Sequence, residues 1–168
     1  ALFWEVLPAS AYIETDLGSS LFVEVGTGQG WHDDDANWSY TLPFTFPFYG
    51  QDYDTAYVCS NAFVNFGSGD SDYTNSDAEL IASTRIAVMW DDLKTNETGN
   101  DIFIDESVSG EVTIRWDAVT ISGSYPCNVS LTLYEDGRIR FHYGSGNTNL
   151  TPTIGISAGD GVNYTLAS

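Results

Sequence analysis

The sequence predicts an all-β fold, an antiparallel β-sandwich of jelly-roll-like form with almost no helix. Apolar and polar residues alternate along its extended segments, as they do in strands with one buried and one solvated face. Gly- and Asp-rich segments separate these strands at intervals that suit a sandwich. They cover residues 26–30, 67–77, 95–101, 122–125 and 144–148. With 168 residues, we expect a single domain over residues 1–168.

The alternation assigns the strands in chain order. The first expected strand covers residues 21–25, and the others cover residues 85–90, 111–116, 130–134 and 138–143. The Asp136-Gly137 step between the last two strands predicts a tight antiparallel hairpin. A helical turn is expected over residues 76–80.

The segment at residues 42–50 alternates large aromatic residues with prolines. Proline has no N–H to donate to a sheet ladder, so we expect an edge strand here, with Phe44, Phe46 and Phe48 on one side. These rings form either a wedge in the core or an aromatic platform for a ligand.

The charge balance is strongly acidic, with 24 Asp and Glu against 5 Lys and Arg and a formal net charge of -19. A polyanion of this density repels phosphate groups, which argues against nucleic acid and anionic membranes as partners. The chain has no apolar run of about 18 residues, so no membrane insertion is expected. Together with a start at Ala1, these features predict a secreted or cell-surface, extracellular segment of a larger protein.

The two cysteines, Cys59 and Cys127, allow one intramolecular pairing. Each lies beside a predicted strand, so a disulfide would join distant parts of the sandwich and close a long loop. Two buried free thiols are the alternative.

An ordered series of motifs carries a family resemblance. Its members are residues 46–50, 57–67, 86–93, 129–143, 153–156 and 159–161. The series resembles bacterial extracellular jelly-roll accessory domains, which are appended to secreted proteases and surface proteins and are similar to nidogen and plexin-repeat-like domains. The resemblance covers residues 41–168, leaves residues 1–40 outside, and implies a domain without enzymatic activity. Ala62 stands where the group usually has a turn glycine, and Cys59 where it usually has a small residue.

Two acidic segments could bind calcium. Hard Ca²⁺ takes about six to eight oxygen ligands from carboxylates, amides and carbonyls, which residues leaving one strand and opening the next can supply together. Solvated loops with Asx-turn roles are the alternative. The expected ligands are Asp91, Asp92, Asn100 and Asp101 in one segment and Asp33, Asp34 and Asp35 in the other.

Loop aromatics and a basic stripe are the candidate ligand-binding residues. Aromatic faces stack on sugar rings or plug the ends of a sandwich. The candidates in the loops are Trp31, Trp38, Tyr73 and Tyr125. Arg138 and Arg140 should share an outward sheet face with His142, and Arg115 should join them from a neighbouring strand. These side chains either pair across strands with Glu111 or Glu135 or form a stripe for an anionic glycan.

These features favour a non-catalytic extracellular binding or adhesion module, stabilised by calcium, that presents loops to an extracellular polysaccharide or a surface protein. One alternative is a polysaccharide- or protein-hydrolysing enzyme that uses an acidic carboxylate pair. His32 and His142 lie in no recognisable triad motif, which argues against nucleophilic catalysis. The other alternative is a purely structural spacer or assembly domain.

Overall fold

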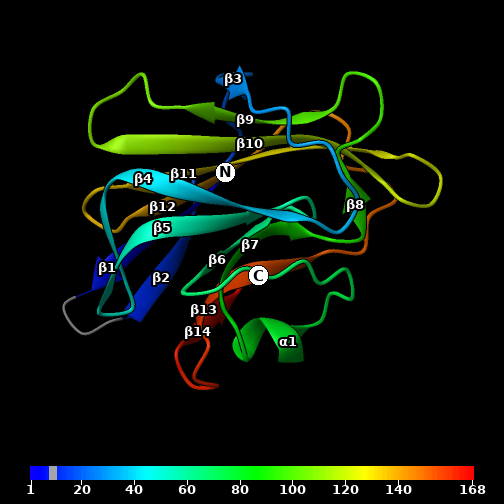
Figure 1. Cartoon of the computed structure of the whole chain (residues 1–168). Coiled ribbons are helices and arrows are strands. Elements are labelled where there is room, and N and C mark those ends of the chain that lie inside the picture. Colours follow the sequence, from blue (N-terminus) through cyan, green and yellow to red (C-terminus); the bar gives the residue numbers. More distant parts are fainter. Residues whose placement is uncertain (8–10) are drawn as a thin grey trace.

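The computed structural model describes residues 1–7 and 11–168, and its regular secondary structure is almost entirely β-strand (Figure 1). Its strands form two antiparallel sheets that pack face to face. This arrangement confirms the all-β sandwich that the sequence predicts. In the described part of the chain, the helical content is one short segment, α1 (Asp77–Ile81).

The first sheet has eight strands, in the order β2-β1-β12-β11-β10-β9-β3, with β8 also paired to β10. Its strands are β1 (Leu2–Leu7), β2 (Ala11–Asp16), β3 (Thr27–Gly28), β8 (Leu93–Lys94), β9 (Asp101–Asp105), β10 (Glu111–Thr120), β11 (Pro126–Tyr134) and β12 (Ile139–Tyr143). The second sheet has six strands, in the order β14-β13-β7-β6-β5-β4. Its strands are β4 (Asn37–Phe48), β5 (Gln51–Cys59), β6 (Phe63–Phe66), β7 (Thr84–Trp90), β13 (Thr153–Ala158) and β14 (Tyr164–Leu166).

The core lies between the two sheets and follows the alternation of the sequence. On β10, Val112, Ile114 and Trp116 are fully buried, and the residues between them point to the outer face of the first sheet. The predicted strands at 85–90, 111–116, 130–134 and 138–143 are confirmed as parts of β7, β10, β11 and β12. Their polar positions point away from the core, although Arg85, Arg115 and Ser130 are themselves buried by neighbouring segments.

The proline-containing segment is confirmed as an edge strand, because β4 ends the six-stranded sheet. Phe46 and Phe48 are buried and stack on each other with ring centroids 6.0 Å apart. Both also pack on Phe66. Phe44 is half-buried against the same cluster. These rings form the wedge in the core and not a ligand platform.

The hairpin and the helical turn are confirmed as well. Gly137 has a φ of 89°, the left-handed conformation that favours glycine, and its N–H donates to the carbonyl of Tyr134 over 2.8 Å. Ser76 caps α1, since its Oγ accepts the N–H of Glu79 over 3.2 Å and donates to the Glu79 carboxylate over 3.0 Å.

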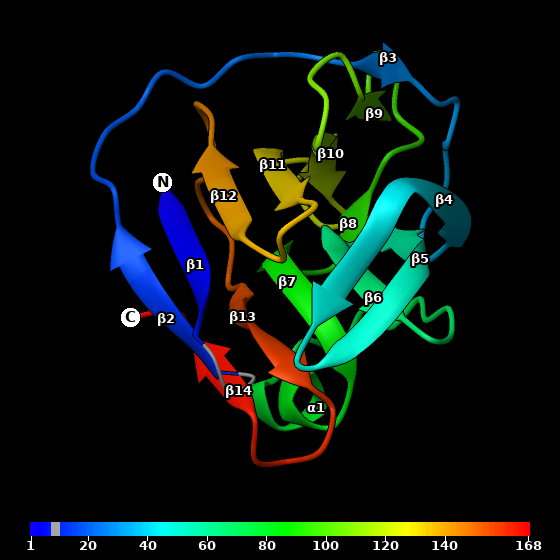
Figure 2. The ribbon, with the colours of Figure 1, turned by 90° about the vertical axis from the view of Figure 1, so that its left-hand side faces the viewer.

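The predicted strand at residues 21–25 is wrong. These residues form no ladder and lie in the connection from β2 to β3, and Leu21 is 84% exposed. Because β2 and β3 occupy opposite edges of the same sheet, residues 17–26 must cross the sheet instead of joining it (Figure 2). We call residues 17–26 the strap. Their alternation does not mark a buried face, because Leu21 and Val23 are exposed while Phe22 and Val25 are partly covered.

The predicted disulfide is not formed, because Cys59 and Cys127 are both free and buried. Cys127 points into the main core between the sheets. On β5, Val58 points into that core, so the next residue, Cys59, points to the opposite side of its sheet, where it packs with Phe63 and Leu80. The two thiols therefore lie on different sides of the six-stranded sheet.

Candidate functional site

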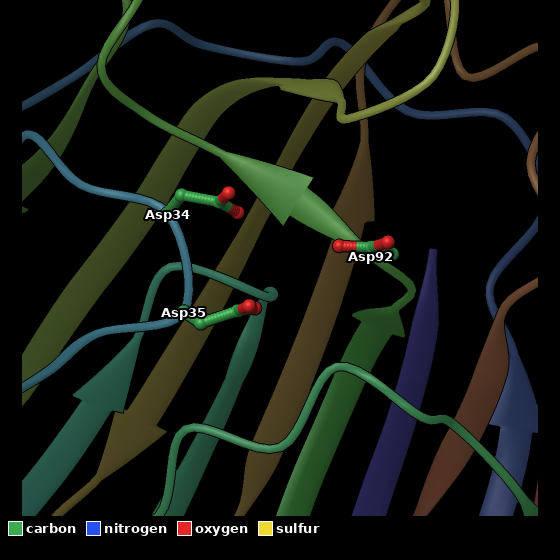
Figure 3. Close-up of side chains that lie close together, drawn as sticks. All are labelled: Asp34, Asp35 and Asp92. Atoms are coloured by element: carbon green, nitrogen blue, oxygen red, sulfur yellow. The ribbon is translucent and has the colours of Figure 1, made fainter.

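Three carboxylates converge at one end of the sandwich. Asp34 and Asp35 lie in the segment that precedes β4, and Asp92 lies in the turn between β7 and β8 (Figure 3). One oxygen from each carboxylate lies within 4.8 Å of those of the other two. We call Asp34, Asp35 and Asp92 the acidic triad.

Asn61 holds the two segments of the acidic triad together. This fully buried side chain donates from Nδ2 to Oδ1 of Asp35 over 3.0 Å, and its Oδ1 accepts the N–H of Leu93 over 2.8 Å. It lies in the turn between β5 and β6, where the next residue, Ala62, has a left-handed φ of 55°. No pattern in the sequence points to Asn61, although Ala62 at a usual glycine position marks this turn.

Thr95 fastens the segment around Asp33 to the strand β8. The N–H of Thr95 donates to the carbonyl of Asp33 over 2.9 Å, and the N–H of Asp33 donates to Oγ1 of Thr95 over 3.1 Å. Oγ1 of Thr95 also donates to the carbonyl of Trp31 over 2.7 Å. Asp34 and Lys94 form a single antiparallel bridge beside this pair. The backbone of the acidic triad is therefore held by hydrogen bonds from both sides.

The carboxylates of the acidic triad repel one another. Burial raises the pKa of Asp34 first, the charge of Asp35 raises it further, and Lys94 partly opposes this rise. The pKa of Asp92 is raised by burial and then by Asp35 and Asp34. The nearby Lys94 ammonium also forms an ion pair with Glu97 over 2.8 Å. The negative charge of the triad is thus only partly balanced.

One oxygen of the acidic triad has no partner. Oδ1 of Asp34 is buried and accepts no hydrogen bond from the residues that the structure describes. A buried polar atom without a partner costs free energy, on the order of 1–3 kcal/mol. A bound cation would satisfy this oxygen and reduce the repulsion at the same time.

The predicted grouping of the acidic ligands is wrong in part. Asp92 meets Asp34 and Asp35 instead of Asn100 and Asp101. Asp101 accepts the N–H groups of Gly30, Trp31 and Ile102, and Asn100 donates to Asp117 over 3.0 Å.

The two remaining acidic candidates stabilise loop backbone. Asp91 accepts the N–H groups of Asp92 and Thr151 over 2.9 and 2.6 Å. Asp33 accepts the N–H of Asp34 over 2.9 Å. Both carboxylates bind loop backbone, but the local bond goes to the next residue and not to the residue two positions on, as it would in an Asx turn. The candidate ligands reduce to the acidic triad.

The aromatic candidates divide into a stack and two isolated rings. Trp31 and Trp38 are parallel, with an interplanar angle of 2° and centroids 5.4 Å apart, and both are half-buried against the core. Tyr73 and Tyr125 are 54% and 42% exposed. The Trp31–Trp38 stack flanks the segment that carries Asp34 and Asp35, so the acidic triad and the stack belong to one end of the molecule.

The basic candidates lie on the outer face of the first sheet, as their alternation predicts. Their predicted pairing with Glu111 or Glu135 is wrong. Arg138 pairs with Asp136 over 2.8 Å, and Arg115 lies 4.0 Å from Asp117. Both carboxylates lie two residues along the chain, so local pairing replaces cross-strand pairing. Arg140 forms no ion pair with a described side chain.

Among protein-family models, the chain matches the one described as NIDO related, over residues 12–168. The chain belongs to the NIDO-related family. Domains of this family are typically extracellular and generally non-catalytic. The match begins at residue 12 and so includes most of the N-terminal part that the motif series leaves outside.

Comparison with curated proteins and with solved structures gave no match. In the described part of the NIDO-related domain, the helix is too short and too polar to cross a membrane.

Proposed function

We propose that this NIDO-related domain is a non-catalytic extracellular binding module in a larger secreted protein. Its acidic triad binds Ca²⁺, and the ion stabilises the loops that the domain presents to an extracellular polysaccharide or a surface protein. The observation that carries the proposal is the convergence of Asp34, Asp35 and Asp92, together with the buried oxygen of Asp34 that has no partner among the described residues.

The donor set supports calcium over other metals. The three ligands are carboxylates, the hard oxygen donors that Ca²⁺ prefers, whereas zinc sites use mostly cysteine and histidine. Calcium also tolerates irregular coordination completed by water, which suits a site with three protein carboxylates at a partly exposed position.

Calcium would act here as a cross-link. Asp34 and Asp35 precede β4 in the second sheet, and Asp92 precedes β8, which pairs with the first sheet. An ion between them would tie loops from both sheets and hold the Trp31–Trp38 stack in place. This fixed arrangement would lower the ordering cost of binding a partner at this end of the sandwich.

A calcium titration of the melting temperature tests the proposal. At saturating Ca²⁺, we expect the melting temperature to rise by about 5–10 °C relative to an EGTA control, because an ion that binds only the folded state stabilises it by mass action. Asp92→Asn should abolish this rise. Asp52→Asn removes the same charge from an exposed position on β5 and should retain it. A wild-type protein with equal melting temperatures in Ca²⁺ and EGTA would refute the calcium site.

The raised pKa values of Asp34 and Asp92 also favour a second candidate, a hydrolase with an acidic pair. Such an enzyme needs two carboxyls that face each other across a substrate. The acidic triad instead converges on one point, which supports the metal-binding interpretation. Turnover of a polysaccharide or of casein that is lost in Asp92→Asn would favour the enzyme.

A further inference from the structure

The outer face of the first sheet carries a groove that shares no residue with the acidic triad. The groove has a volume of ≈ 310 Å³, close to the lower limit of about 300 Å³ for small-ligand pockets. Its floor is formed by β10, β11 and β12, and Leu21, Val23 and Val25 of the strap line it from one side. Figure 2 shows the strap passing over these strands on its way from β2 to β3.

Arg140 is the unusual residue of this groove. The chain has 5 Lys and Arg against 24 Asp and Glu, and each of the other four basic residues contacts a carboxylate. Arg140 contacts none among the side chains that the structure describes. Its Nε is buried and donates no hydrogen bond, and its guanidinium lies 5.7 Å from the ring centroid of Phe3. Within the described part of the chain, this guanidinium therefore has donors that no carboxylate accepts from, although the protein is strongly acidic.

The groove floor supplies further donors beside Arg140. The strand register places Arg140 opposite Thr132 and places His142 opposite Ser130. Ser130 and Thr132 are buried at the floor, and Oγ1 of Thr132 shares a hydrogen bond with Thr113 over 2.8 Å. Hydroxyl groups and an imidazole are the groups that bind sugar hydroxyls and oxyanions.

The negative groups of the groove lie at its other end. Asp105 accepts the N–H and hydroxyl of Ser107 over 3.1 Å each, so both its oxygens are engaged. Asp105 lies in the register row of Arg140 but three strands away, on β9. Glu111 lies two strands away, on β10, and one row from that of Arg140. The positive end of the groove is therefore the part over β12.

We propose that this groove binds an oxyanion group, a carboxylate or a sulfate, carried by an extracellular acidic polysaccharide, with Arg140 as its charged partner and His142 beside it. The proposal goes beyond the calcium-dependent end of the molecule, because it uses a different face and different residues. Charge complementarity is local: the domain as a whole repels polyanions, but Arg140, which has no ion pair with a described side chain, fits one anionic group. The hydroxyl-rich floor and the apolar Leu21 and Val23 suit the polar edge and the apolar face of a sugar ring.

The test is a binding titration by NMR in EGTA, with the two histidines as reporters. The probes are a galacturonate trimer, the same trimer with methyl-esterified carboxyls, dextran sulfate and neutral dextran. We expect the ring signals of His142 to shift with the galacturonate trimer or with dextran sulfate. The signals of His32, which lies 3.5 Å from Asp101 and outside the groove, should stay unchanged. The anionic probe that binds distinguishes carboxylate from sulfate.

Matched variants test the role of Arg140. Arg140→Gln should weaken binding at least about tenfold, because a charge-assisted pair is lost. Arg138→Gln makes the same charge change at a residue of the β12 hairpin that is paired with Asp136 and lies outside the groove lining, and it should change binding less than about twofold. Arg140→Lys keeps the charge but lacks the planar guanidinium, so it should retain part of the affinity. This variant replaces Arg140→Gln in the test if Arg140→Gln is unstable.

Three results would overturn the proposal: equal binding of the esterified trimer, equal losses in the Arg138 and Arg140 variants, or no shift of His142 with any anionic probe. Because the titration is done in EGTA, its outcome is independent of whether the acidic triad binds calcium.

Discussion

Nε1 of Trp116 donates a hydrogen bond to the backbone carbonyl of Cys59 over 2.7 Å, and this bond joins the two sheets inside the core. Trp116 belongs to β10 of the first sheet and Cys59 to the end of β5 in the second. Both are fully buried. The bond lies directly before the turn that contains Asn61, so the core interaction and the position of the acidic triad are physically linked.

Replacing Trp116 with Phe should destabilise the domain by about 2–4 kcal/mol. The variant leaves the buried carbonyl of Cys59 without a donor and removes part of a packed ring. Urea unfolding measures the change in the free energy of unfolding. Trp38→Phe changes a half-buried ring at the surface stack and should cost clearly less; equal losses in both variants would contradict the role assigned to the inter-sheet bond.

The acidic triad should make stability in EGTA depend on pH. Because the pKa values of Asp34 and Asp92 are raised in the folded state, the folded protein binds more protons than the unfolded chain above the ordinary Asp value of 3.8. Stability should therefore fall as pH rises from about 4 through the raised values. Melting temperatures measured across this range should show a shallower fall for Asp34→Asn than for wild type, and Asp52→Asn should behave like wild type.

His142 should titrate below its ordinary pKa of 6.5, because burial and then the charge of Arg140 disfavour its protonated form. The unfolded chain then binds more protons than the folded one below about pH 6.5, so this residue destabilises the protein as the pH falls through that range. The N-terminal ammonium lowers it as well. Arg140→Gln removes one of these three causes and should raise the pKa of His142. An NMR titration of the His142 ring in both proteins checks this, and an unchanged value in the variant would contradict the placement of Arg140 beside it.

The free thiols should be inert in the folded protein. Burial raises the pKa of Cys59 to about 12, and it also raises the pKa of Cys127. Because the thiolate is the reactive form, iodoacetamide should label neither residue in native buffer and both in urea. A reducing agent should leave the melting temperature unchanged. A melting temperature that falls on reduction would indicate the disulfide that the structure does not contain.

The sequence predicts a strand or turn correctly where the residues that determine it are close together in the chain. The hairpin at Gly137 and the cap at Ser76 depend on residues within a few positions of each other, and alternation alone identifies most strands. Residues 21–25 show the limit of this signal, because they alternate as a strand does although they join no ladder and Leu21 and Val23 stay exposed. The distinction requires the strand order, which places β2 and β3 at opposite edges.

For the candidate metal site, the sequence predicts that aspartates supply the ligands, but it does not predict which of them meet. Asp92 was expected to meet Asn100 and Asp101, its near neighbours in sequence, but strand pairing brings it to Asp34 and Asp35. Asn61 could not be recognised, because its role depends on a turn from another part of the sheet. The long-range contacts that build the site arise from topology, which no local pattern contains.

The strap also sets a limit on the width of the first sheet. Six inter-strand spacings of about 4.8 Å separate β2 from β3, a span of roughly 29 Å. The eleven Cα steps from Asp16 to Thr27 reach at most about 36–40 Å when fully extended. The strap is thus only slightly longer than the span it covers. A strap shortened by three residues would reach only about 26–29 Å. With such a strap, β2 and β3 could not both pair at the edges of the sheet. The length of this exposed segment therefore limits how many strands the sheet beneath it can contain.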